Sequence, residues 1–254
     1  CVHLGCETGS PSQKRSVGWG EFTVYNTSFA RALPDSPFSL FCTMKRIWDI
    51  SPAVGVTSPV FPGDASFTID WSARVSEGDF ANVSILRFSP HIGAHVDSPM
   101  HLDSAAPDVA GLKLETFIGR CRVVDLSQNE RTGEIGPDEF PLRNLPTRVL
   151  VKTRAKRVDG WSTDYRPISP ALMRRIIDAG VVLLGVDMPS VDPAESTVLP
   201  SHRIALAHNR VLMENLDLSE VPAGDYELIA LPLRLSGAEA SPVRAVLRSL
   251  TVGR

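Results

Sequence analysis

The sequence predicts one mixed α/β or α+β domain of about 211 residues, from residue 44 to residue 254, in which strands outnumber short helices. Several segments either alternate apolar and polar residues or form short apolar runs, the patterns of half-buried and fully buried strands. The chain has 254 residues, 43% hydrophobic and 22% charged, which suits one globular domain with a real core. No internal repeat, low-complexity tract or linker divides the sequence after residue 44.

The predicted elements follow one another in chain order, with one well-marked helix among the strands. A short strand at 46–50 ends at Ser51-Pro52. Ser169 is the expected N-cap of a helix, Pro170 is its first residue, and Gly180 ends it. Alternating or apolar patterns predict the other strands at 66–75, 83–88, 120–126, 148–153, 181–186, 226–233 and 243–250.

The first 43 residues differ in composition from the rest. They are rich in Gly, Ser, Thr and Pro and lack sustained periodicity. Met44 precedes the first periodic segment, so we interpret it as the natural start and residues 1–43 as a disordered extension outside the fold. A targeting peptide is the alternative, but the apolar cluster at 38–41 is short and has no basic segment immediately before it. The prediction is therefore a single domain at 44–254.

Charge, hydropathy and cysteine content exclude several classes of protein. A net charge of −3 and a pI near 6.1 give no electrostatic case for binding nucleic acid. No apolar run approaches the eighteen residues of a membrane span, which predicts no membrane partner. The four cysteines form no CxxC pair and suit a reducing compartment, so we expect a cytoplasmic protein without a disulfide framework.

The most informative segment is His91-Ile-Gly-Ala-His95-Val-Asp97-Ser-Pro99-Met-His101, which holds half of the six histidines of the chain. Imidazole and carboxylate are ligands of divalent metals such as Zn²⁺. A polar loop that is rich in histidine by chance is the alternative. Four such side chains in eleven residues make the metal-site interpretation the stronger one.

The spacing of these residues predicts a bent backbone. In a regular strand His91 and His95 would lie roughly 13 Å apart, too far to share a metal comfortably. In a regular helix Asp97 would turn away from them. A turn through Gly93 followed by extended chain from His95 to Asp97 brings all three together, because glycine tolerates dihedrals that other residues avoid.

A catalytic metal needs ligands from a second segment, and the best source is residues 201–216. His202 begins this segment, and Glu214 lies in an apolar run where a carboxylate is unlikely to be buried unless it is paired or bound to a cation. An ordinary salt bridge of Glu214 with an arginine is the alternative. We interpret His208 as an exposed residue, and His3 lies in the extension.

The signature at 91–101 resembles that of the cyclase-like metal hydrolases, and more closely that of the bacterial kynurenine formamidases (arylformamidases). Other segments resemble the same branch, from Met44 to the C-terminus: 61–64, 185–192, His202 with Glu214, 224–233 and 241–248. The resemblance implies a compact α/β fold of the cyclase-like, swivelling β/β/α type, with a mixed sheet core and short helices. It also implies a homodimer.

The resemblance further implies two Zn²⁺ ions per subunit. His91, His95 and Asp97 would bind one ion and His202 the second, while Asp97 and Glu214 would touch both. Carboxylates suit such bridging because each oxygen can bind a different ion, and two ions some 3.5–4 Å apart can share a hydroxide and stabilise an oxyanion.

By the same resemblance, His101 is the catalytic general acid/base and Phe61 contacts the substrate, an aromatic formamide. The implied reaction is hydrolysis of N-formyl-L-kynurenine to L-kynurenine and formate by a metal-bound hydroxide, a step of tryptophan degradation. A metal lowers the pKa of bound water from ~15.7 to about 7, and a histidine can protonate the departing amine. The family often has Trp at the position of Phe61 and an aromatic residue at that of Leu102, departures that bear on substrate preference alone.

Two other interpretations remain open on the sequence. One is another amide or lactam hydrolase of the same superfamily, acting on a cyclic substrate and using Mn²⁺, because nitrogen and oxygen ligands without thiolate do not select zinc firmly. The other is a non-catalytic metal-binding module. A structural zinc site normally has four protein ligands, often cysteines, so a carboxylate-rich set with a spare histidine favours an open catalytic site.

Overall fold

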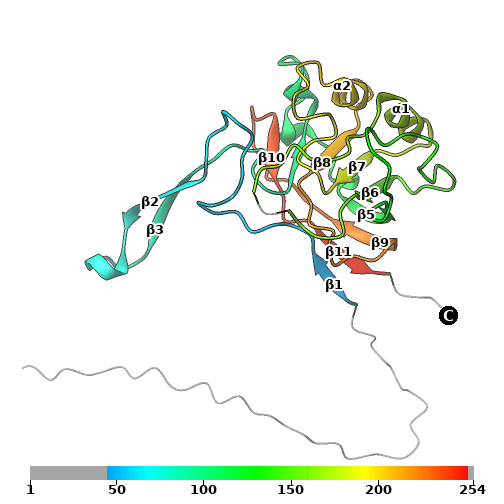
Figure 1. Cartoon of the computed structure of the whole chain (residues 1–254). Coiled ribbons are helices and arrows are strands. Elements are labelled where there is room, and N and C mark those ends of the chain that lie inside the picture. Colours follow the sequence, from blue (N-terminus) through cyan, green and yellow to red (C-terminus); the bar gives the residue numbers. More distant parts are fainter. Residues whose placement is uncertain (1–44, 159, 251–254) are drawn as a thin grey trace, which may run out of the picture. The chain divides into compact units, whose positions relative to one another are not determined.

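The computed structural model describes residues 45–158 and 160–250. These residues form a nine-stranded mixed sheet, a separate two-stranded sheet and two α-helices (Figure 1). The order of strands in the large sheet is β1-β11-β9-β5-β6-β7-β8-β4-β10. The strands are β1 (Ile47–Asp49), β2 (Thr68–Ala73), β3 (Val83–Arg87), β4 (His95–Asp97), β5 (Ile118–Asp125), β6 (Arg148–Lys152), β7 (Leu183–Val186), β8 (Val211–Glu214), β9 (Gly224–Ile229), β10 (Ala240–Pro242) and β11 (Val246–Ser249).

The centre of the large sheet is parallel and its two sides are antiparallel. Strands β5, β6, β7 and β8 run parallel to one another. Strands β9, β11 and β1 continue the sheet antiparallel on one side, and β4 and β10 do so on the other. The helices α1 (Pro170–Asp178) and α2 (Pro200–Ala207) lie between successive parallel strands in the sequence, as crossover connections require.

Alternating side chains of the central strands form two apolar cores, one on each face of the sheet. Val149 and Val151 of β6 pack with Leu172 and Ile176 of α1 on the helical face, whereas Leu150 belongs to the core on the opposite face. Figure 1 shows α1 and α2 next to each other above the strands. The sheet is therefore covered on both faces, as the apolar runs of its parallel strands predict.

The predicted helix is confirmed, and a strand overlaps each predicted strand range, with shifted ends. The helix α1 has Ser169 as N-cap, whose hydroxyl accepts a hydrogen bond from the backbone N–H of Leu172, and Gly180 follows it with φ of +87°. Of the predicted strand at 243–250, only β11 forms, and β10 pairs separately with β4. The sequence patterns miss α2 and β8 as elements.

The predicted strands at 66–75 and 83–88 form, but they do not join the large sheet. Strands β2 and β3 pair only with each other, as an antiparallel hairpin. Large apolar side chains are exposed on this hairpin and its tip, among them Ile69, Trp71, Phe80, Ile85 and Leu86. The hairpin therefore contributes nothing to either core.

The described residues belong to one compact unit. None of their helices is long and apolar enough to cross a membrane. Cys121 is buried and forms no disulfide with another described residue. The extension predicted at 1–43 lies outside the described residues, and the boundary at Met44 stays a prediction.

Candidate metal centre

The histidine-rich segment bends at Gly93 and then enters the sheet as β4. Gly93 has a φ of +62°, and a Cβ atom there would lie 2.6 Å from the Val54 side chain. The chain is extended from His95 to Asp97, so the predicted bend is confirmed. Strand β4 pairs antiparallel with β8, and this register places His95 opposite Glu214. Two candidate ligands far apart in the sequence thus become neighbours on adjacent strands.

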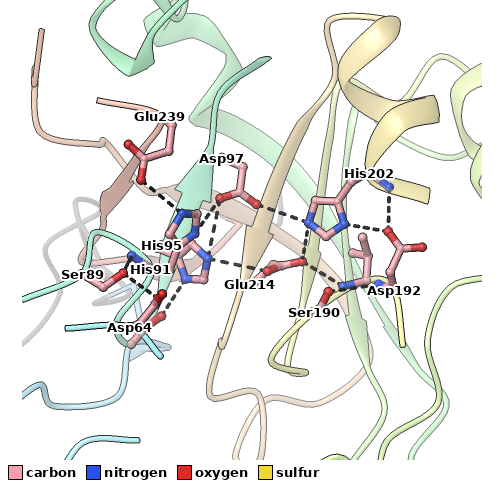
Figure 2. A network of polar contacts seen from close by, with 12 residues as sticks. Asp64, Ser89, His91, His95, Asp97, Ser190, Asp192, His202, Glu214 and Glu239 are labelled. Atoms are coloured by element: carbon pink, nitrogen blue, oxygen red, sulfur yellow. Dashed lines mark hydrogen bonds and ion pairs between the residues drawn. The ribbon is translucent and has the colours of Figure 1, made fainter. Parts of the chain in front are cut away.

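Asp97 lies between two groups of imidazoles (Figure 2). Its Oδ1 atom is 3.2 Å from His91 Nδ1 and 3.7 Å from His95 Nε2. Its Oδ2 atom is 3.6 Å from His202 Nε2. The two oxygens of this carboxylate therefore face different histidines.

Glu214 repeats this arrangement from β8. Its Oε2 atom is 3.6 Å from His95 Nε2, and its Oε1 atom is 3.3 Å from His202 Nε2. Oε1 also accepts a hydrogen bond of 2.8 Å from the backbone N–H of Val191. The structure thus brings together all five residues for which the sequence predicts metal binding, and both carboxylates span the same two groups of histidines.

The side chain of Asp97 fits a cation better than it fits its protein neighbours. It is 1% exposed, and neither of its oxygens accepts a hydrogen bond from a described residue. A buried carboxylate without such partners is costly, and imidazole nitrogens at 3.2–3.7 Å leave the gap that a shared cation would fill. The donor set of imidazoles and carboxylates is typical of borderline divalent metals.

The charges of the site are strongly coupled. Burial raises the pKa of Asp97, but His202, His91 and His95 lower it more, to well below its usual range. Burial likewise raises the pKa of Glu214, whereas His202 and His95 lower it to about 2. Both carboxylates are therefore ionised at neutral pH and available as ligands.

Two of the imidazoles show the opposite shift. Burial lowers the pKa of His91, but Asp97 raises it to about 9. Burial also lowers the pKa of His202, whereas Glu214, Asp192 and Asp97 raise it well above its usual value. In the metal-free protein these rings hold protons that neutralise the carboxylates, and a bound cation would take the place of those protons.

His101 lies at the edge of this cluster, at the end of the 3₁₀ turn Pro99–His101. Its ring centroid is 4.7 Å from that of His91 and 5.8 Å from that of His202. One nitrogen of His101 also falls within 4.8 Å of ligand atoms of His91 and Asp97, so its ring could itself contact a cation. Burial lowers the pKa of His101, and His91 and His202 lower it further although Asp97 raises it, so this ring is neutral at pH 7.

A cavity of about 380 Å³ opens onto the cluster, a size suited to a small molecule. Phe61 and Trp161 both line it, with ring centroids 5.3 Å apart in an edge-to-face contact. These two residues come from different irregular segments of the chain. The cavity therefore combines an aromatic wall with a base of histidine and glutamate side chains.

The structure also adds residues that the sequence patterns miss. Trp161 lies in the irregular connection after β6 and carries no periodic signal. Asp192 and Glu239 contact His202 and His91, respectively, from other loops. His208, expected on the surface, is exposed and donates a hydrogen bond from Nδ1 to the Ile204 carbonyl.

Known proteins are similar to this chain in sequence and in fold. The Cyclase family model matches residues 48–193. The kynurenine formamidase of Delftia acidovorans is 44% identical over 206 residues, which cover 81% of this chain and 99% of that protein. The kynurenine formamidase of Bordetella petrii is 46% identical over 214 residues, which cover 82% of this chain and 100% of that protein. The chain belongs to the kynurenine formamidases of the Cyclase family.

The likeness of this formamidase family member to solved structures confirms its predicted fold class. A protein described as a potential metal-dependent hydrolase with cyclase activity superposes with a TM-score of 0.70 at 21% identity. The superposition covers 81% of this chain and 98% of that one. The family match at 48–193 contains the whole segment from His91 to His101, while His202 and Glu214 lie beyond it. The assignment of individual site residues therefore rests on the geometry described above.

Proposed function

We propose that this chain hydrolyses N-formyl-L-kynurenine to L-kynurenine and formate, as an arylformamidase of tryptophan degradation. Relatives that bear the name kynurenine formamidase match the chain at 44% and 46% identity over nearly their whole length. The observation that carries the proposal is the pair of buried carboxylates, Asp97 and Glu214, beside histidines that line a cavity with an aromatic wall. Each carboxylate directs its two oxygens at two different groups of imidazoles.

The same geometry supports a centre with two divalent ions, which we propose to be Zn²⁺, with Mn²⁺ as the alternative. His91 and His95 would hold one ion and His202 the other, while Asp97 and Glu214 would contact both. When bound, the ions would lower the pKa of a coordinated water and polarise the formyl oxygen. Nitrogen and oxygen ligands without thiolate do not select zinc firmly, so ion identity is a matter for measurement.

The protein's own side chains orient the substrate and move the proton. Phe61 and Trp161 would contact the aromatic ring and so hold the formamide over the cluster. The neutral ring of His101 would first accept a proton from the attacking water. It would then donate this proton to the aniline nitrogen as the C–N bond breaks, which makes the amine a better leaving group.

A purified sample tests the proposal against its rivals. We expect formate release from N-formyl-L-kynurenine with about two ions per chain, and little turnover of a cyclic lactam. Preferential turnover of the lactam would favour the other branch of the superfamily. Stable metal binding without turnover of either substrate would favour the non-catalytic module.

We also propose that the protein is a homodimer and that the β2–β3 hairpin contributes to its interface. An isolated two-stranded hairpin is marginal in water, and this one exposes Trp71, Ile85 and Leu86 together with the fully exposed Phe80. Light scattering after size exclusion should give twice the chain mass. Trp71→Ser with Ile85→Ser should reduce it to the chain mass if the hairpin forms the interface.

We propose the cytoplasm as the location of the protein, on the basis of its sparse cysteines without CxxC pairs. A fractionation experiment on cells expressing the natural gene would test this.

A further inference from the structure

We propose that Asp192 is a positioning residue that fixes the ring of His202, so that Nε2 of this ring faces the metal centre. The inference rests on the proposed metal centre and goes beyond it, because it assigns a role to a carboxylate outside the ligand set. Asp192 lies in the irregular segment between β7 and α2, and only 1% of its surface is exposed.

Both oxygens of Asp192 accept hydrogen bonds from the start of α2, and Figure 2 shows those from His202. Its Oδ2 atom accepts hydrogen bonds from His202 Nδ1 at 2.7 Å and from the His202 backbone N–H at 2.9 Å. Its Oδ1 atom accepts a bond of 2.8 Å from the backbone N–H of Ser201. One buried carboxylate thus holds both the backbone and the ring of His202.

The contact to the ring decides which nitrogen of His202 can bind a cation. The Oδ2 atom of Asp192 is the acceptor for both the backbone N–H and Nδ1 of His202, so Nδ1 carries the hydrogen of this bond. Nε2 faces Asp97 Oδ2 at 3.6 Å and Glu214 Oε1 at 3.3 Å. In the metal-free protein a proton on Nε2 lies between this nitrogen and the two carboxylates. When that proton is lost, the lone pair of Nε2 becomes available to a cation at the same place. Carboxylates that hold the outer nitrogen of a metal-binding histidine are a recurring feature of metal sites.

The other two imidazoles are held differently. His95 Nδ1 donates to the carbonyl of Gly93 at 2.9 Å, within the same turn. His91 Nε2 lies 3.4 Å from Glu239 Oε1, and the side chain of Glu239 is 39% exposed. The pair of Asp192 and His202 is therefore shorter and more deeply buried than its counterpart on the other side of the centre.

The two sides of the centre also differ in number of imidazoles. Among the described residues, His91 and His95 both face Asp97 Oδ1, whereas His202 alone faces Asp97 Oδ2. Losing the orientation of His202 would therefore remove the single imidazole of the second metal position. The first position would keep both of its rings. A substitution of Asp192 should therefore weaken the binding of mainly one of the two ions.

Asp192 also has a structural role at the start of α2, which an experiment must distinguish from its effect on the His202 ring. The residue before α2, Leu199, has a φ of +49° and makes no side-chain cap, so Asp192 supplies acceptors for the first N–H groups of the helix. Any change at Asp192 therefore weakens the start of α2 as well. Stability alone cannot distinguish the two roles, whereas the affinities of the two ions can.

The test is zinc titration of the metal-free full-length chain with Asp192→Asn. The amide keeps the shape of the carboxylate but loses one acceptor and can donate to His202 Nδ1, which would favour the tautomer with a hydrogen on Nε2. We expect the weaker zinc to lose about 10–100-fold in affinity, with a much smaller change for the tighter zinc. Glu239→Gln makes the matched change at the exposed counterpart, and its effect should stay within a few-fold.

If Asp192→Asn does not fold, the position of the ring hydrogen of His202 can be measured in the wild-type protein. In the zinc-loaded wild type, ¹H–¹⁵N correlation should show a slowly exchanging hydrogen on Nδ1 of His202. A His202 ring with its hydrogen on Nε2 would overturn the inference, and so would a folded Asp192→Asn that binds both ions as the wild type does. Equal weakening of both ions would indicate a purely structural role. Failure of the wild type to bind zinc would instead overturn the metal centre itself, and this inference with it.

Discussion

Replacing His101 with asparagine separates proton transfer from metal binding. The ring lies beside both groups of imidazoles at the cavity, and among the described residues no hydrogen bond to its side chain holds it. The turn that carries it is closed by a backbone bond from Leu102 N–H to the Pro99 carbonyl, so the fold should survive the change. His101→Asn should therefore alter the chemistry and leave the structure nearly intact.

The expected loss in kcat follows from the surroundings of His101. General acid–base catalysis typically contributes roughly 10²–10⁴-fold, or about 2.7–5.4 kcal/mol in the activation barrier. His91, His95 and His202 already face Asp97 and Glu214, so none of them is free to replace the missing ring. We therefore expect a fall in kcat of at least about 100-fold with N-formyl-L-kynurenine.

The assay compares two substrates and two variants. An activated formate ester has a leaving group that needs little protonation, so His101→Asn should slow its hydrolysis far less than that of the formamide. His208→Asn, on the exposed end of α2, serves as the matched control and should not change either rate. Loss of a metal ion from His101→Asn would show that His101 is a ligand, a role that its position near His91 and Asp97 also permits. Equal slowing of both substrates with metal retained would assign the ring to activation of the water.

Four further outcomes are expected. A chain that begins at Met44 should keep the activity and thermal stability of the full chain, and a marked loss of either would refute the interpretation of 1–43 as an extension. Asp97→Ala should lower occupancy at both metal positions in elemental analysis, because its two oxygens face different histidines; loss of one ion alone would contradict bridging. Phe61→Ala should mainly raise KM in steady-state kinetics, since ring contacts form in ground and transition states alike, and an unchanged KM would exclude substrate contact. Arg122 and Arg120 hold the pKa of Asp225 at about 2 against the effect of burial, so this carboxylate stabilises the fold above its unfolded pKa and loses that effect as pH falls toward 2. Asp225→Asn should lower the free energy of unfolding by about 1–2 kcal/mol at pH 7, with a difference that shrinks in acid denaturation below pH 4.

Elements with local signals could be predicted, and those that depend on distant contacts could not. The ends of α1 are encoded by Ser169, Pro170 and Gly180 within its own sequence. The start of α2 has no local cap, because its acceptor is Asp192, eight positions before the first helical residue. Alternation predicts β2 and β3 as strands, yet the same pattern arises whether one face meets a core or both meet water, so their exclusion from the main sheet was not predictable.

The residues of the candidate site also differ in whether the sequence near them indicates their role. The segment from His91 to His101 is recognisable by residue type alone, and a glutamate in an apolar run already indicates that Glu214 is buried and paired. Trp161 and Glu239 carry no such signal, because each lies in an irregular connection and acquires its neighbours only in the folded chain. What the sequence lacks is the spatial order of strands, which places β4 between β8 and β10.

The position of β4 in the sheet explains why the spacing of residues in the segment from His91 to His101 matters as much as their identity. Val96 packs into one core with Met213, its partner on β8, while His95 and Asp97 point to the other face. A single inserted or deleted residue would exchange these faces, so that an apolar side chain would enter the site and the two polar side chains would enter the core. The length of this segment is therefore constrained from both sides of the sheet at once. During evolution, substitutions can change the residues between the candidate ligands. Insertions and deletions can be tolerated only in the loops outside this segment.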